Sequence, residues 1–140
     1  MKNIFASVTV LISFWFLLGM GGLGGSAPVE KIPEPSKKFT VVVVDRQGVK
    51  TTLGQFSHEG KVFIAGKRGS AEVASPFEII SQVQFKGEEG NDILAEIRMR
   101  DSKLVEIRLD KRSKFYGKAE FGTFQIEAKD LLSINFQPQS

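Results

Sequence analysis

The chain has one histidine, and its neighbours are of the types used in nucleophilic catalysis. Ser57, His58 and Glu59 supply a hydroxyl, an imidazole and a carboxylate in consecutive positions. A catalytic triad needs these groups joined by a line of hydrogen bonds, but neighbouring side chains in a turn point apart. Zinc sites need several His or Cys ligands, and the chain has no cysteine. We therefore expect His58 to be a solvent-exposed turn residue without a catalytic or metal-binding role.

An acidic cluster lies near the middle of the chain. It comprises Glu88, Glu89, Asn91 and Asp92, whose oxygen atoms are of the kind that calcium prefers. The spacing does not match the calcium-binding loop of EF-hands, and no glutamate follows at the distance which that loop requires. Glycines bound the cluster, which is typical of a solvated connection. The sequence predicts a polar linker over residues 87–92, no metal site and no cofactor.

Two basic clusters occupy predicted turns at corresponding places in the two halves of the mature chain. The candidate contacts are Lys67, Arg68, Lys111, Arg112 and Lys114. Charged hairpin tips can bind an anionic lipid or an acidic partner, or they can serve solubility alone. The net charge of +3 is too small to indicate nucleic acid, which export disfavours further. The expected partner is an envelope protein or an anionic surface.

The sequence of residues 1–26 has the pattern of a signal peptide. Lys2 is followed by an apolar run from Ile4 to Leu18, and glycines and small residues then lead to Ser26. This order of a positive start, an apolar run and a small-residue exit is typical of secretory signals. We expect a cleaved signal and an exported protein, either periplasmic or secreted. The alternative is an uncleaved membrane anchor over residues 4–23, the one case in which membrane contact is expected.

The mature part predicts strands after a short linker. Residues 27–38 are rich in proline and charge, and proline favours extended, solvated chain. From Phe39 onward polar and apolar residues alternate as in half-buried strands, most clearly over residues 93–100. Single helical turns are expected near Ser75 and Asp130. The fold class is therefore all-β, a small antiparallel barrel or barrels or a sandwich, with about eight to ten strands.

Two strings in the mature part resemble each other. Residues 78–85 match residues 130–136 if the first string carries one extra residue, and a turn glycine, Gly69 or Gly122, precedes each. Duplication and chance coincidence of short aliphatic strings both remain open. Each half is too small to bury a stable core alone, so we expect the halves to share one. The predicted organisation is a β repeat over 39–86, a linker over 87–92 and a second β repeat over 93–140.

The second string belongs to a longer pattern of glycine and apolar positions. The pattern reads Gly117-x4-Gly122-x-Phe124-x-Ile126-x4-Leu131-x2-Ile134-x-Phe136. It resembles a short β-barrel repeat of exported bacterial proteins of unassigned function, which is similar to SH3-like and Sm-like small barrels. The resemblance covers about a third of the chain well and the first half poorly. It implies tandem SH3-like repeats, and it transfers no catalytic or binding residue.

Three functional classes remain open. The first is a non-enzymatic binding or scaffolding module of the cell envelope, which presents loops or a strand edge to a partner. The second is a small exported enzyme with an unrecognised active site, and the third is an assembly factor tethered by an uncleaved anchor. We expect the first, because no catalytic motif is present. The valine-rich strand from Phe39 to Val44 needs cover from the other half or from a second copy in a homo-oligomer.

Overall fold

The computed structural model describes residues 31–138. The predicted signal peptide, the alternative anchor and the start of the linker lie outside these residues. The strands are β1 (Val41–Asp45), β2 (Lys50–His58), β3 (Phe63–Arg68), β4 (Ala71–Pro76), β5 (Ile80–Glu89), β6 (Asp92–Met99), β7 (Leu104–Asp110), β8 (Lys114–Ala119), β9 (Gly122–Glu127) and β10 (Leu131–Phe136). Two single turns of 3-10 helix are η1 (Phe77–Ile79) and η2 (Ala128–Asp130). Within this part of the chain, no helix has the length and hydrophobicity needed to cross a membrane.

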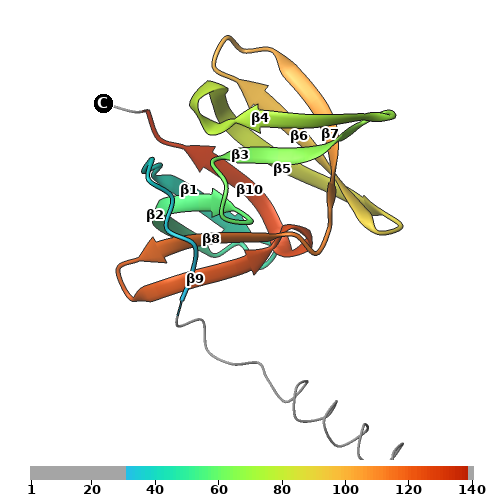
Figure 1. Cartoon of the computed structure of the whole chain (residues 1–140). Helices are drawn as coiled ribbons and strands as arrows, with labels where there is room; N and C mark the ends of the chain where they lie inside the picture. Colours follow the sequence, from blue (N-terminus) through green and yellow to red (C-terminus); the bar gives the residue numbers. More distant parts are fainter. Residues whose placement is uncertain (1–30, 139–140) are drawn as a thin grey trace, which may run out of the picture.

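The ten strands form one strongly curled antiparallel sheet (Figure 1). Their order across it is β4-β3-β7-β6-β5-β10-β1-β2-β8-β9. The all-β prediction and the expected strand number are confirmed. The two helical turns also lie where they were predicted, although Ser75 belongs to β4 and no side chain caps η1.

The strand order divides the sheet into two units of five strands. Unit I consists of β3 to β7, and unit II consists of β8 to β10 together with β1 and β2. Adding 51 to the bounds of β3, β4 and η1 gives the bounds of β8, β9 and η2. The same shift aligns three buried residues at the start of β5 with three in β10. These pairs are Ile80 with Leu131, Val83 with Ile134, and Phe85 with Phe136. The two strings therefore align without the extra residue that the sequence comparison required.

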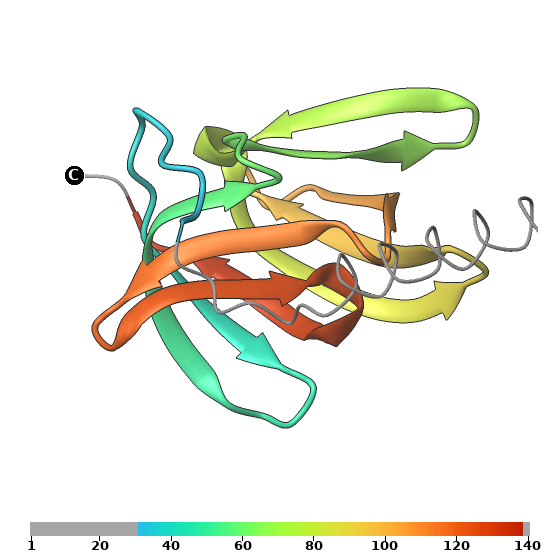
Figure 2. The same ribbon diagram turned by 60° about the horizontal axis from the view of Figure 1, so that its bottom comes forward.

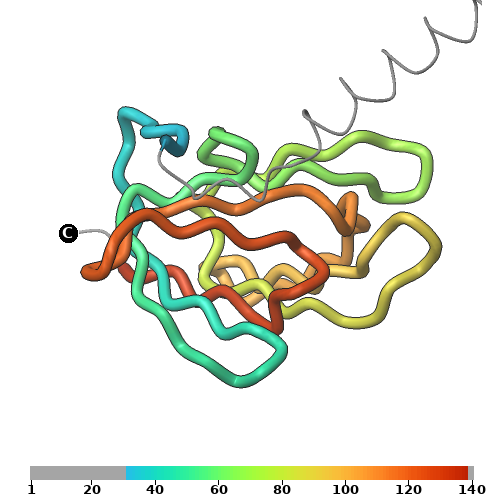
Figure 3. Tube along the Cα trace, turned by 90° about the horizontal axis from the view of Figure 1, so that it is seen from below, coloured from blue at the N-terminus to red at the C-terminus, as the bar shows by residue number. Residues whose placement is uncertain are grey.

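The first two strands of the described residues, β1 and β2, complete unit II on the side of β10 and β8. β1 lies between β10 and β2, with Val43 opposite both Ile134 and Thr51, and β2 pairs in turn with β8. Figures 2 and 3 show the blue-green beginning of the described chain beside its orange-red end. This grouping differs from the predicted repeats, since strands of the first repeat pair with those of the second. The predicted linker at 87–92 forms the β5–β6 hairpin inside unit I.

The two units meet where β5 pairs with β10. Val83 and its equivalent Ile134 stand directly opposite each other in this pairing, so an approximate twofold axis passes between them. The core then extends through both units. The Phe56 ring of unit II lies 5.5 Å from the Phe77 ring of unit I, and the buried apolar residues form a single cluster. A shared core is what the small size of each half predicts.

Two equivalent glycines let neighbouring strands approach closely. A Cβ atom at Gly66 would lie 2.6 Å from the Arg108 carbonyl oxygen, and one at Gly117 would lie 2.8 Å from the Leu53 Cβ. We expect Gly66→Ala and Gly117→Ala each to lower the free energy of unfolding by about 2 kcal/mol through overpacking. Gly87→Ala is the control, because nothing lies within 4 Å of its added Cβ. Urea unfolding measures all three, and equal losses would contradict the packing argument.

Candidate functional site

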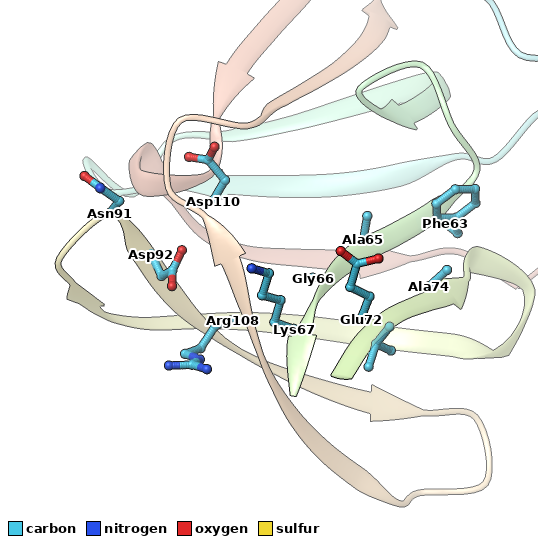
Figure 4. Close-up of a pocket in the computed structure, with 11 residues that line it drawn as sticks. Phe63, Ala65, Gly66, Lys67, Glu72, Ala74, Asn91, Asp92, Arg108 and Asp110 are labelled. Atoms are coloured by element: carbon cyan, nitrogen blue, oxygen red, sulfur yellow. The ribbon is translucent and has the colours of Figure 1, made fainter. Parts of the chain in front are cut away.

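A trough of about 590 Å³ lies on the outer face of unit I (Figure 4). It is lined by residues 63 and 65–67 of β3, 72–74 of β4, 91–92 at the β5–β6 turn, and 108 and 110 of β7. On the opposite face of β3, Ile64 is fully buried in the core. The same strand thus supplies the core with one row of side chains and the trough with the other.

The trough exists because β3 and β7 separate. The two strands pair at one position only, where Lys67 stands opposite Arg108. In unit II the equivalent strands β8 and β2 stay paired from Gly54 to His58, past a bulge that inserts one residue into β2. Unit II is therefore closed where unit I is open.

Small residues form the floor of the trough. Ala65 and Ala74 are cross-strand partners on the outer face of the β3–β4 hairpin, and both are exposed. Their equivalents in unit II are Tyr116 and Gln125, which are also cross-strand partners. Large side chains therefore stand on unit II where unit I presents two methyl groups.

Charged residues of both signs surround this floor. They are Lys67, Glu72, Asp92, Arg108 and Asp110. None of the five takes part in the ion pairs found among residues 31–138. Lys67 stands opposite Glu72 across the β3–β4 hairpin, but two other cross-strand pairs bring like charges together, with Lys67 opposite Arg108 and Asp92 opposite Asp110. Such cross-strand pairs are unfavourable in isolation, so a ligand that carries both charges would relieve two repulsions at once.

His58 lies beside the trough and is buried, so the expected exposed turn position is wrong. It is the last residue of β2, is 3% exposed, and stacks on Phe115 with ring centroids 4.3 Å apart. The Ala65 amide donates a hydrogen bond to Nδ1 at 3.2 Å, so Nε2 carries the ring proton and donates to the Ser113 hydroxyl at 2.9 Å. β7 does not pair with β3 at Ala65, so the Nδ1 atom of His58 takes the place of a strand carbonyl as the acceptor for the Ala65 amide.

The neighbours of His58 do not join it in a catalytic arrangement. The Ser57 hydroxyl is buried without a hydrogen-bond partner in the described part of the chain. The Glu59 carboxylate accepts a hydrogen bond from the Lys114 backbone amide at 2.9 Å. Both ring nitrogens of His58 are occupied within the fold, so the ring has no free nitrogen to act as a base in the trough.

The basic residues predicted as partner contacts fall in separate places. Lys67 lines the trough, and Arg68 follows it at the exposed end of β3. The second cluster, residues 111–114, occupies the connection from β7 to β8 and the first position of β8. The residue equivalent to Lys67 is Lys118, so the two clusters do not hold equivalent positions.

The acidic cluster is divided between a salt bridge and the trough. The Glu88 carboxylate lies 3.2 Å from the Lys111 ammonium group. Glu89 stands opposite Asp92 in the hairpin, and Asn91 and Asp92 line the trough. Across residues 31–138, no group of three or more His, Asp or Glu side chains is arranged to hold a metal ion.

Sequence reasoning missed most of the trough. Arg108 and Asp110 read as the polar face of an ordinary alternating strand, and the alanines carried no signal of their own. Comparing positions 51 residues apart would have exposed the difference, because Ala65 and Ala74 then stand against Tyr116 and Gln125.

Burial of His58 makes stability depend on pH. Loss of hydration lowers its pKa from 6.5 to about 4, although the Phe63 carbonyl acts in the opposite direction. Because the folded state disfavours the proton, this contribution is complete above pH 6.5 and is lost as the pH falls toward 4. We expect a loss of about 3 kcal/mol over that range relative to His58→Gln. Urea unfolding at several pH values measures it, and parallel profiles for the two proteins would contradict it.

Comparison with known proteins gives a family for most of the chain. No curated protein and no solved structure matches it. A family model described as "Uncharacterised protein" matches residues 35–139, which include all ten strands and both helical turns. The chain belongs to this uncharacterised protein family.

Proposed function

We propose that the protein is an exported, non-enzymatic binding module of the cell envelope, and that it holds an extended segment of a partner protein in the trough of unit I. The observation that carries this proposal is the set of five charged residues around the alanine floor, none of which takes part in an ion pair among residues 31–138. Export is inferred from the signal pattern of residues 1–26.

The charges favour a protein over an anionic surface as the partner. Lys67 and Arg108 attract a carboxylate, whereas Glu72, Asp92 and Asp110 repel phosphate groups and attract a cation. A polypeptide can present both signs within a few residues. Its backbone also suits the floor, because Ala65 and Ala74 leave room for a chain to approach the sheet.

The difference between the two units supports a binding role for unit I. A closed outer face is compatible with this fold, as β2, β8, Tyr116 and Gln125 show in unit II. The open face of unit I is therefore not required for folding. We further propose that both units are SH3-like small-barrel repeats, in accord with the glycine and apolar pattern that ends at Phe136.

Filling the trough tests the proposal. Ala65→Tyr combined with Ala74→Gln copies the residues of unit II into unit I, so the variant is expected to fold. The parent protein and the variant are used to capture proteins from envelope extracts, with quantitative mass spectrometry as the readout. We expect the parent to enrich a specific partner and the filled variant to lose at least about tenfold of it.

A charge reversal gives a second, independent readout. Lys67→Glu with Arg108→Glu is expected to cause a similar loss of the partner. The matched control is Lys50→Glu with Arg98→Glu, which reverses two exposed charges outside the trough. A partner retained by the filled variant, or lost equally with the control, would count against the trough as the binding site.

A further inference from the structure

The residues that precede β1 pack against unit II as an extended strap, residues 31–38. The Glu34 carboxylate lies 2.6 Å from the Lys118 ammonium group, and this contact lowers the pKa of Glu34. Pro33 lies against Gly60, where an added Cβ would be 3.1 Å from the Pro33 Cβ. The Lys37 ammonium group lies 2.9 Å from the Glu78 carboxylate in η1 of unit I. The linker expected to be a solvated spacer is thus attached to the domain at Pro33, Glu34 and Lys37.

The strap occupies on unit II the place that the trough occupies on unit I. Lys118, which binds Glu34, is the equivalent of Lys67 in the trough. Gly60 belongs to the connection from β2 to β3, whose equivalent is the connection from β7 to β8 directly after Asp110. Both contact points of the strap on unit II therefore have counterparts at the trough.

Burial along β2 agrees with this correspondence. Ser57 stands opposite Tyr116 in the outward row of unit II, yet it is fully buried. Allowing for the bulge in β2, the corresponding residue of unit I is Asp110, which is exposed. The outer face of unit II is covered at the point where that of unit I is open.

We propose that the trough of unit I binds an extended polypeptide segment with the charge pattern of the strap, a cation three residues before a carboxylate. This inference rests on the proposed function and specifies its ligand. The carboxylate pairs with Lys67 as Glu34 pairs with Lys118. The cation, at the place of Lys31 in the strap, lies toward Asp110 and the adjacent Asp92. The segment belongs to another protein, because the strap of this chain is held at unit II by its junction with β1.

The acetylated, amidated peptide of residues 31–37, Lys-Ile-Pro-Glu-Pro-Ser-Lys, is a direct probe. Amide spectra of the ¹⁵N-labelled protein are recorded during titration with this peptide. We expect saturable changes in the amide chemical shifts of Ala65, Lys67, Glu72 and Ala74. Lys67→Glu should weaken binding about fivefold or more, since one ion pair becomes a repulsion.

An exchanged pair of charges separates recognition from general attraction. The peptide carrying E34K should bind the Lys67→Glu variant more tightly than the original peptide binds that variant. Lys50→Glu is the matched control and should leave both affinities unchanged. Absence of saturable shifts up to about 10 mM peptide would overturn the inference. Shifts confined to Lys118 and Gly60 would do the same, because they would mean that the peptide only displaces the strap.

The two proposals can fail separately. If the peptide does not bind while the filled variant still loses its envelope partner, the charge pattern is wrong and the trough remains a binding site. If neither effect is seen, both proposals are wrong. Sedimentation distinguishes a second copy of this chain as the occupant, since dimers that are lost with Lys67→Glu would contradict a segment from another protein.

Discussion

The shared core, the completeness of unit II and the position of the strap all depend on the insertion of β1 between β10 and β2. The strand is almost entirely valine, and it is hydrogen-bonded along both edges, so its β-branched residues are covered rather than exposed at an edge. Val41 and Val43 contribute to the core, which the two units share. Without β1 and β2, unit II would lack two of its five strands, and the strap would have no anchor beside Lys118.

The functional features arise where the two units differ. The approximate twofold axis between β5 and β10 relates equivalent strands and equivalent turns. Local differences between the units then determine whether each outer face is open or closed. One extra residue in β2 and the Tyr116–Gln125 pair keep unit II closed, whereas Ala65 and Ala74 leave unit I open. His58 makes the opening stable, because its Nδ1 atom accepts the hydrogen bond that the Ala65 amide would otherwise donate to a carbonyl of a neighbouring strand.

The local structure of this chain could be predicted from its sequence, and the pairing could not. Alternation over 93–100 identifies a strand, since the side chains of a strand point to opposite faces in turn. No such periodicity indicates that β1 pairs with β10, which comes from the far end of the chain. The predicted exposure of His58 is wrong for a related reason. A Ser-His-Glu-Gly string reads as an exposed turn, but strand β3 and the β7–β8 connection cover it in three dimensions. The trough depends on two alanines whose significance appears only beside their counterparts in the other unit.

The position of β1 also has a consequence for how the molecule folds. The first strands of the described chain pair with the last ones, so their neighbours exist only when the whole chain is present. Contacts between distant parts of a chain are slow to form, because a large loop must close before they contribute. Until then the valine strand is an unpaired apolar segment of the kind that promotes aggregation. Delivery of the complete chain before folding begins, or a chaperone that shields the valine segment, would shorten this exposure.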